Sequence, residues 1–332
     1  MWIPVLLFVL GLLLLIKGGD WFVDGATSIA RRFHISEILI GATVVSIGTT
    51  LPEVMVSAQA AIGGHGEMAY GNAIGSIICN TALIAAISVA VRPTKADRKT
   101  LIMPVAFFFG AFAVYAFTAY FFGYFSRWTG ILLLLIFVVY MLLSVRNALG
   151  ENLPKAPTPD TELVGDETLD PPEKRGALLK DLCFLVVGAA LIAIGANLLV
   201  DNGTLIAEEI GVPESVIALT FVALGTSLPE LVTAITSLVK GHGSLSLGNV
   251  IGANLFNLVL VSGVATTLSP FAVPASKEVF GINSSLLIDI PLAALGMAFL
   301  VLPAIFRKKL SRFQGIALLC VYAAFCTVQF VL

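Results

Sequence analysis

Two acidic residues lie in nearly identical apolar contexts, one in each half of the chain. Glu53 ends the segment SIGTTLPE (46–53), and Glu230 ends the segment ALGTSLPE (223–230). Placing a charged side chain at the centre of a membrane helix costs roughly 2.5–3.5 kcal/mol on insertion scales, and such residues usually face a cavity on an ion path. The matched pair therefore predicts one shared cation site.

The residues just before each glutamate predict an irregular backbone. Pro52 cannot donate a hydrogen bond to the carbonyl four residues earlier, and Gly48 and Gly225 weaken the corresponding turns. We therefore expect short unwound stretches at 46–49 and 223–226. Their free carbonyl oxygens would be tolerated in a bilayer only where protein or water satisfies them.

Hydroxyl and amide side chains recur near these carboxylates. Thr50 and Ser227 each lie three residues before a glutamate, so each shares a helix face with its carboxylate. Ser76 and Asn80 are four residues apart in the following apolar segment, and Asn257 takes the place of Asn80 in the second half. Oxygen ligands with two negative charges suit a hard divalent cation, and their flexibility fits calcium better than magnesium.

The composition indicates a membrane protein and excludes several other classes. Hydrophobic residues make up 58% of the chain and charged residues 12%, and the mean hydropathy is +0.98, well outside the range of soluble domains. A net charge of −2 offers no basic surface for nucleic acid, and no Gly-x4-Gly-Lys-Ser/Thr motif for a nucleotide is present. The histidines fall near span boundaries, away from any candidate nucleophile, so we expect neither an enzyme nor a resident cofactor.

Polar and Gly/Pro breaks divide the chain into apolar segments of about 20 residues, the length of a membrane span. The predicted spans are 2–29, 37–62, 68–91, 100–123, 128–148, 177–204, 214–239, 245–270, 281–305 and 312–331. With these ten spans, 16 of the 19 Lys and Arg residues fall on one side, which the positive-inside rule assigns to the cytoplasm. We expect a multi-pass protein of the cell (inner) membrane with both termini outside the cytoplasm.

The chain is duplicated internally. Segment 41–84 aligns with segment 218–261 at 16 identities in 44 positions, without a gap. Because each half holds five predicted spans, the second half must enter the membrane with opposite polarity. We therefore expect an all-α polytopic membrane protein of ten transmembrane helices, built as two inverted five-helix repeats (1–149 and 177–332). The Pro- and acid-rich segment 150–176 is expected to be a flexible cytoplasmic linker.

The paired GTT/SLPE segments, the GN-x-IG segments that follow them and the ten-span repeat resemble the cation/calcium exchanger superfamily, close to its prokaryotic calcium/sodium antiporter branch. The resemblance implies alternating access, in which the first and sixth helices slide against the others and a sodium or proton gradient expels calcium. It also implies that the two glutamates are the central ligands and that two backbone carbonyls complete the shell. The expected site residues are Glu53, Glu230, Thr49, Thr50, Thr226, Ser227, Ser76, Asn80, Asn257 and, through their carbonyls, Ser46 and Ala223.

Three positions depart from the pattern of that superfamily. Some sodium-coupled members carry aspartate where this chain has Asn257, Ala253 replaces the serine that would match Ser76, and Ile77 replaces an asparagine. Calcium/sodium exchange is the expected function, with calcium/proton exchange and a cation channel as alternatives; a channel would select along a continuous pore. The expected partners are the lipid bilayer, calcium and monovalent cations, and no sequence feature indicates an oligomeric state.

Charged residues also occur in the first predicted span. Asp24 in the first span and Asp201 in the sixth occupy equivalent places in the two halves. Because Arg31 and Arg32 follow Asp24 closely, we expect Asp24 to form a structural ion pair or to serve at the helix end, with a role in gating as the alternative.

Overall fold

The computed structural model describes residues 2–93, 98–151, 175–209, 225–275, 278–279 and 281–331. In the first half the elements are α1 (Trp2–Arg32), α2 (Glu37–Ile40), η1 (Gly41–Val45), α3 (Ser46–Ile62), α4 (Gly66–Cys79), η2 (Asn80–Ala85), α5 (Ala86–Val91), α6 (Arg98–Phe122), β1 (Tyr124–Phe125) and α7 (Arg127–Glu151). In the second half they are α8 (Arg175–Glu209), α11 (Leu228–Val239), α12 (Gly243–Phe256), η4 (Asn257–Val261), α13 (Ser262–Leu268), β2 (Phe271–Ala272), β3 (Glu278–Val279), β4 (Ile282–Asn283), η5 (Ser285–Asp289), α14 (Ile290–Arg307) and α15 (Arg312–Val331). The η elements are π-helical.

Eight helical segments in the described part of the chain are long and apolar enough to cross a membrane, and each coincides with a predicted span to within a few residues. Two shorter apolar helices, Leu228–Val239 and Arg312–Val328, fall within the remaining two predicted spans. The start of the seventh predicted span, 214–224, lies outside the described residues. The prediction of a helical, multi-pass membrane protein is therefore confirmed.

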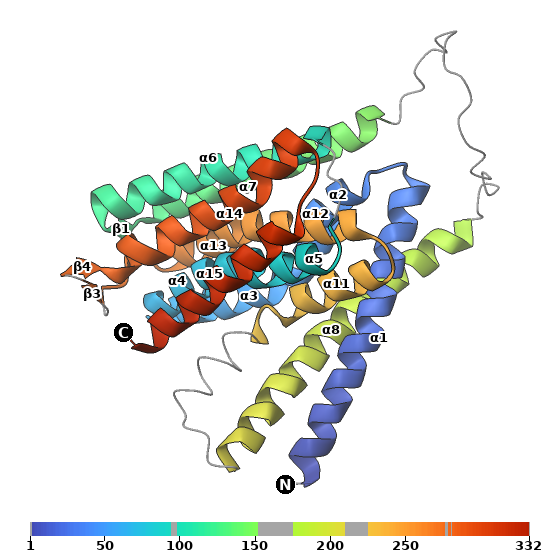
Figure 1. Cartoon of the computed structure of the whole chain (residues 1–332), viewed down its shortest axis with the longest axis horizontal. Coiled ribbons are helices and arrows are strands. Elements are labelled where there is room, and N and C mark those ends of the chain that lie inside the picture. Colours follow the sequence, from blue (N-terminus) through green and yellow to red (C-terminus); the bar gives the residue numbers. More distant parts are fainter. Residues whose placement is uncertain are drawn as a thin grey trace.

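Helices α1 and α8 form a pair that is inclined to the remaining helices (Figure 1). Glycines allow the two backbones to approach closely, as small residues do in membrane helix pairs. A Cβ atom added to Gly18 would lie 2.9 Å from the carbonyl oxygen of Gly188, and one added to Gly195 would lie 2.8 Å from that of Gly11. Since Gly11 meets Gly195 while Gly18 meets Gly188, the two helices run antiparallel.

The buried apolar side chains form two main clusters. The larger one joins helices α4–α7, α11, α12, α14 and α15 and includes the fully buried rings of Phe108, Tyr115 and Phe256. The smaller one is centred on α1 and α8, with Phe22 and Leu185 among its members. The α1–α8 pair is thus packed largely around a core of its own.

Local backbone structure repeats between the two halves of the duplicated sequence. Helix α4 spans 66–79 and α12 spans 243–256, and both continue directly into a π-helical segment, η2 or η4. The turns that precede them also match, with Gly64 at φ +82° and Gly241 at φ +87°. Only glycine adopts this left-handed conformation without strain, which explains why both copies of the turn contain it.

The prediction of an unwound stretch at 46–49 is wrong. Helix α3 begins at Ser46 and continues through Pro52, and the irregular backbone lies one turn earlier, in η1. A π-helix shifts hydrogen bonding to residues five apart, so η1 takes up the local distortion. The Phe22 ring packs against Gly48, where an added Cβ would lie 3.1 Å from it, and leaves little room for the chain to open there.

The second copy of the motif differs from the first. Thr226 and Ser227 form a turn, and α11 begins at Leu228, with Pro229 in its first helical turn. Proline is well placed there because the first backbone N–H groups of a helix lack intrahelical acceptors in any case. The described part of 223–226 thus contains a helix break, whereas residues 223 and 224 lie outside the described residues.

Candidate cation site

Glu53 on α3 and Glu230 on α11 are both fully buried. Both carboxylate oxygens of Glu53 and the Oε2 atom of Glu230 lack a hydrogen-bond partner among the described residues. Helices α3 and α11 bring the two side chains near each other, because Thr50, about one turn before Glu53, contacts the Glu230 carboxylate. Buried like charges without partners are costly, so these two carboxylates are candidates to share a cation or to bind protons.

Thr50 connects the two halves at this point. Its Oγ1 atom donates a hydrogen bond of 3.3 Å to Oε1 of Glu230. The spacing of three residues had placed Thr50 on the same helix face as Glu53, whereas its hydrogen bond crosses to the other half. The hydroxyl therefore orients the Glu230 carboxylate and links α3 to α11.

A second contact between the halves involves two predicted ligands. The Oγ atom of Ser227 lies 3.5 Å from that of Ser76 on α4, and both side chains are buried. The site residues of α4 and α11, which are distant in sequence, are therefore neighbours. Thr226, in the turn before Ser227, is half-buried.

Asn80 and Asn257 occupy corresponding places in η2 and η4. Each is the first residue of its π-helical segment and is fully buried. Within the described structure, the amide nitrogen and the amide oxygen lack a hydrogen-bond partner in both side chains. π-helical turns inside α-helices are frequent at functional sites, and the two unpartnered amide oxygens offer ligands to a cation.

Ser46 and Thr49 are more engaged with the protein than the other predicted residues. Ser46 Oγ donates to the carbonyl oxygen of Gly41 at 2.7 Å or of Asn249 at 2.9 Å. Thr49 Oγ1 lies 3.4 Å from both the Ser46 carbonyl oxygen and Oδ1 of Asn249. The Ser46 hydroxyl therefore has a structural role, while its carbonyl stays a predicted ligand. Ala223 lies outside the described residues.

The sequence interpretation had not assigned a role to Asn72 or Asn249. The Nδ2 atom of Asn72 donates to the backbone carbonyl of Glu53 at 3.1 Å and to Oγ of Ser57 at 2.8 Å. It thereby fixes α3 against α4 at the central carboxylate. The signal was available, because Asn72 and Asn249 are identical residues in the duplicated GN-x-IG segment.

The chemistry of the site is that of oxygen ligands. Within the described ranges, no group of three or more His, Cys, Asp and Glu side chains is arranged to hold a metal ion. The candidate ligands brought together here are two carboxylates, hydroxyls and amides. Such a set suits hard cations, such as calcium or sodium, rather than zinc or copper.

Comparison with known proteins identifies the family. The family model described as "Sodium/calcium exchanger protein" matches residues 3–146 and 180–331. A putative antiporter, CaxA, of Alkalimonas amylolytica is 35% identical over 332 residues, covering 98% of both chains. The sodium/calcium exchanger MaX1 of Methanosarcina acetivorans is 32% identical over 359 residues, again covering 98% of each.

A solved structure and a further sequence relative give the same result. The sodium-calcium exchanger NCX_Mj, soaked with 10 mM Na+ and no Ca2+, has a TM-score of 0.77 and 30% sequence identity, with 97% of each chain covered. An uncharacterised membrane protein of Methanocaldococcus jannaschii is 33% identical over 321 residues, covering 95% of this chain and 94% of the relative. The chain described here therefore belongs to the sodium/calcium exchanger family.

Proposed function

We propose that this protein is a secondary antiporter that exchanges calcium for sodium at one site between its two halves, by alternating access. Glu53 and Glu230 are its central ligands. The observation that carries the proposal is that these two fully buried carboxylates approach each other from equivalent places in the duplicated sequence, with three of their four oxygens unpartnered in the described structure. Their two negative charges balance one calcium ion.

The remaining ligands fit the same cargo. Calcium binds about six to eight oxygen atoms in flexible geometry. The two carboxylates supply up to four of them, and the amide oxygens of Asn80 and Asn257 and the hydroxyls of Ser76 and Ser227 are the further candidates. Backbone carbonyls of Ser46 and Ala223, with Thr49, Thr50 and Thr226, complete the proposed set.

The contacts of α1 with α8 support an inverted repeat with halves 1–149 and 177–332. In the alignment of the two halves, Gly11 corresponds to Gly188 and Gly18 to Gly195. Swapping each residue for its counterpart in the other half therefore turns the Gly11–Gly195 contact into the Gly188–Gly18 contact, and both contacts are present. This is expected for two units related by a two-fold axis. Because the helices are antiparallel, that axis lies in the membrane plane, the arrangement of many secondary transporters.

Sodium is the proposed coupling ion. Hydroxyl and amide oxygens can bind sodium, but protonation of two carboxylates requires none of them. Two protons would nevertheless neutralise the two glutamates, so proton exchange is the second candidate. The relatives named as a sodium/calcium exchanger and a sodium-calcium exchanger also favour sodium.

We place both termini outside the cytoplasm of the cell membrane and the 150–176 segment inside. The support is the distribution of the basic residues, 16 of 19 on one face of the ten-span arrangement. Single cysteines introduced at the two ends and labelled from either side of the membrane test this orientation. Labelling of the C-terminus from the cytoplasm alone would contradict it.

Transport in proteoliposomes tests the function. Vesicles loaded with sodium and diluted into sodium-free medium at clamped pH should accumulate radioactive calcium. Glu53→Gln and Glu230→Gln should each abolish this uptake, because each removes one of the two compensating charges while preserving shape. Glu67→Gln, which changes an exposed carboxylate at the start of α4, is the matched control and should transport normally. Uptake that follows only a pH gradient would instead favour proton coupling, and a unitary current far above carrier turnover would favour a channel.

A further inference from the structure

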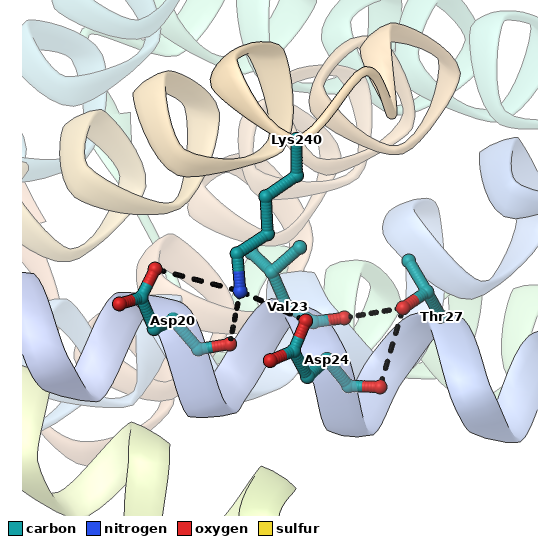
Figure 2. Close-up of polar contacts among 5 residues, drawn as sticks. All are labelled: Asp20, Val23, Asp24, Thr27 and Lys240. Carbon is teal, nitrogen blue, oxygen red and sulfur yellow. Dashed lines mark hydrogen bonds and ion pairs between the residues drawn. The ribbon is translucent and has the colours of Figure 1, made fainter.

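Lys240 joins the site-bearing helix α11 to α1. It follows the last residue of α11, and its side chain extends across to α1 (Figure 2). The Nζ atom lies 2.8 Å from Oδ1 of Asp24 and 3.4 Å from Oδ1 of Asp20, and donates to the Asp20 backbone carbonyl at 3.0 Å. Asp24 thus forms an ion pair, and its partner here is Lys240 from the other half of the chain, whereas the sequence pointed to Arg31 and Arg32.

This contact has no counterpart at the equivalent place of the first half. The residue that aligns with Lys240 is Gly63, and it has nearly the same backbone conformation, φ −71° and ψ −2° against φ −75° and ψ −3°. Glycine has no side chain with which to form an ion pair. The backbone conformation therefore repeats in the two halves, but the positively charged side chain occurs only at Lys240, in the second half.

The contacts between α1 and α8 differ in kind from the contacts between α1 and α11. Within the pair, the backbones touch through glycines, and Arg32 Nη2 lies 3.4 Å from Oδ2 of Asp181. Towards α11, Gly19 packs against the side chains of Val232 and Thr236, next to the Lys240 contact. The α1–α8 pair is thus suited to act as one body, with Lys240 as a charged tie between it and the helix that bears Glu230.

We propose that Lys240 is an electrostatic latch that holds the α1–α8 pair against α11 in the conformation described here and opens when that pair moves. This inference rests on the proposed alternating access. Because Gly63 provides no such contact, the latch biases the transporter toward one of its two conformations.

The strength of the contact suits a latch that must open in every cycle. The side chains of Lys240, Asp20 and Asp24 are 25%, 40% and 52% exposed, so water and salt screen their attraction. An exposed ion pair typically shifts an equilibrium by about 1.5- to fivefold. Two carboxylates and a carbonyl on one ammonium therefore bias the two conformations by about three- to tenfold.

A reporter cysteine under α1 tests the latch without any transport measurement. Thr236→Cys is introduced after the four native cysteines have been replaced by alanine, and its alkylation by a maleimide is timed in purified protein. Lys240→Gln and, independently, the double variant Asp20→Asn/Asp24→Asn should each speed alkylation about three- to tenfold. Lys240→Arg keeps the charge and should stay near the parent rate. Lys17→Gln, which removes a lysine lying 5.5 Å from the Trp21 ring on the same helix, is the matched control.

Two further measurements separate the possible outcomes. Calcium exchange, measured from each membrane face, should show apparent affinities that shift in opposite directions in Lys240→Gln, as a changed population of two states requires. Thermal unfolding midpoints identify any variant that is merely unstable. Parent-rate alkylation in both the lysine and the double aspartate variants, or equal acceleration in Lys17→Gln, would overturn the latch. Absence of sodium-dependent exchange in the parent protein would reject the proposed function, while the alkylation rates would still decide on the latch.

Discussion

Replacing Asn257 with aspartate probes the charge balance of the site. The Asn257 side chain is fully buried, with neither amide atom hydrogen-bonded within the described structure, so a carboxylate of the same shape fits without breaking a contact. The site then carries three negative charges instead of two. One bound calcium leaves one charge uncompensated, whereas three sodium ions leave none.

The magnitude follows from this difference of one charge. At an effective dielectric constant of about 20, unit charges about 5–6 Å apart interact by about 3 kcal/mol. Three sodium ions carry one more positive charge than one calcium ion, so the added carboxylate favours the three sodium ions by about 3 kcal/mol. This corresponds to about a hundredfold shift in the competition between sodium and calcium. If three sodium ions compete with one calcium ion, the sodium concentration that displaces half of the calcium should fall about fivefold, the cube root of that factor.

Sodium-dependent release of radioactive calcium from proteoliposomes, at clamped pH, measures this concentration and its Hill coefficient. Asn147→Asp adds the same charge at an exposed position on α7 and should leave both unchanged. An Asn257→Asp variant whose calcium affinity changes while its sodium dependence does not would refute the reasoning. It would place Asn257 beside calcium alone.

Two further predictions concern residues that fix one helix against another. Gly188→Ala should lower the thermal unfolding midpoint of the purified protein, because its Cβ would lie 2.5 Å from the Phe22 backbone nitrogen and overpacking of this kind costs about 1–3 kcal/mol; Gly110→Ala, with no atom within 4 Å of its Cβ, should not. Asn72→Ala should raise the calcium concentration for half-maximal uptake severalfold, because it frees the Glu53 carbonyl and leaves α3 less firmly fixed to α4; uptake equal to that of the parent protein would show that Asn72 does not position the carboxylate.

Much of the fold could be predicted because membrane spans depend on properties that a sequence displays directly. Apolar length indicated the spans, and the internal duplication paired the segment of α4 with that of α12. The duplicated motif also identified Glu53 and Glu230, which the structure brings together. The sequence signal for this pair was the repetition of a carboxylate within an apolar segment.

Other features could not be predicted because they depend on contacts between distant segments. The spacing of Thr50 and Glu53 describes one helix face, yet the Thr50 hydroxyl donates to Glu230. The irregular backbone lies in η1, one turn before the stretch expected at 46–49, and neither Gly48 nor Pro52 indicates that position. Lys240 follows the last residue of α11, and its sequence context does not indicate that its partners are on α1.

The position of the bound divalent cation tests the central claim most directly. Crystals soaked with strontium, which gives an anomalous signal in place of calcium, should contain one principal peak between α3 and α11, in direct coordination with carboxylate oxygens of both Glu53 and Glu230. The same peak should be lost in Glu53→Gln and in Glu230→Gln. A peak bound to only one of these glutamates, or a principal peak elsewhere, such as beside Asp20 and Asp24, would contradict a single shared site.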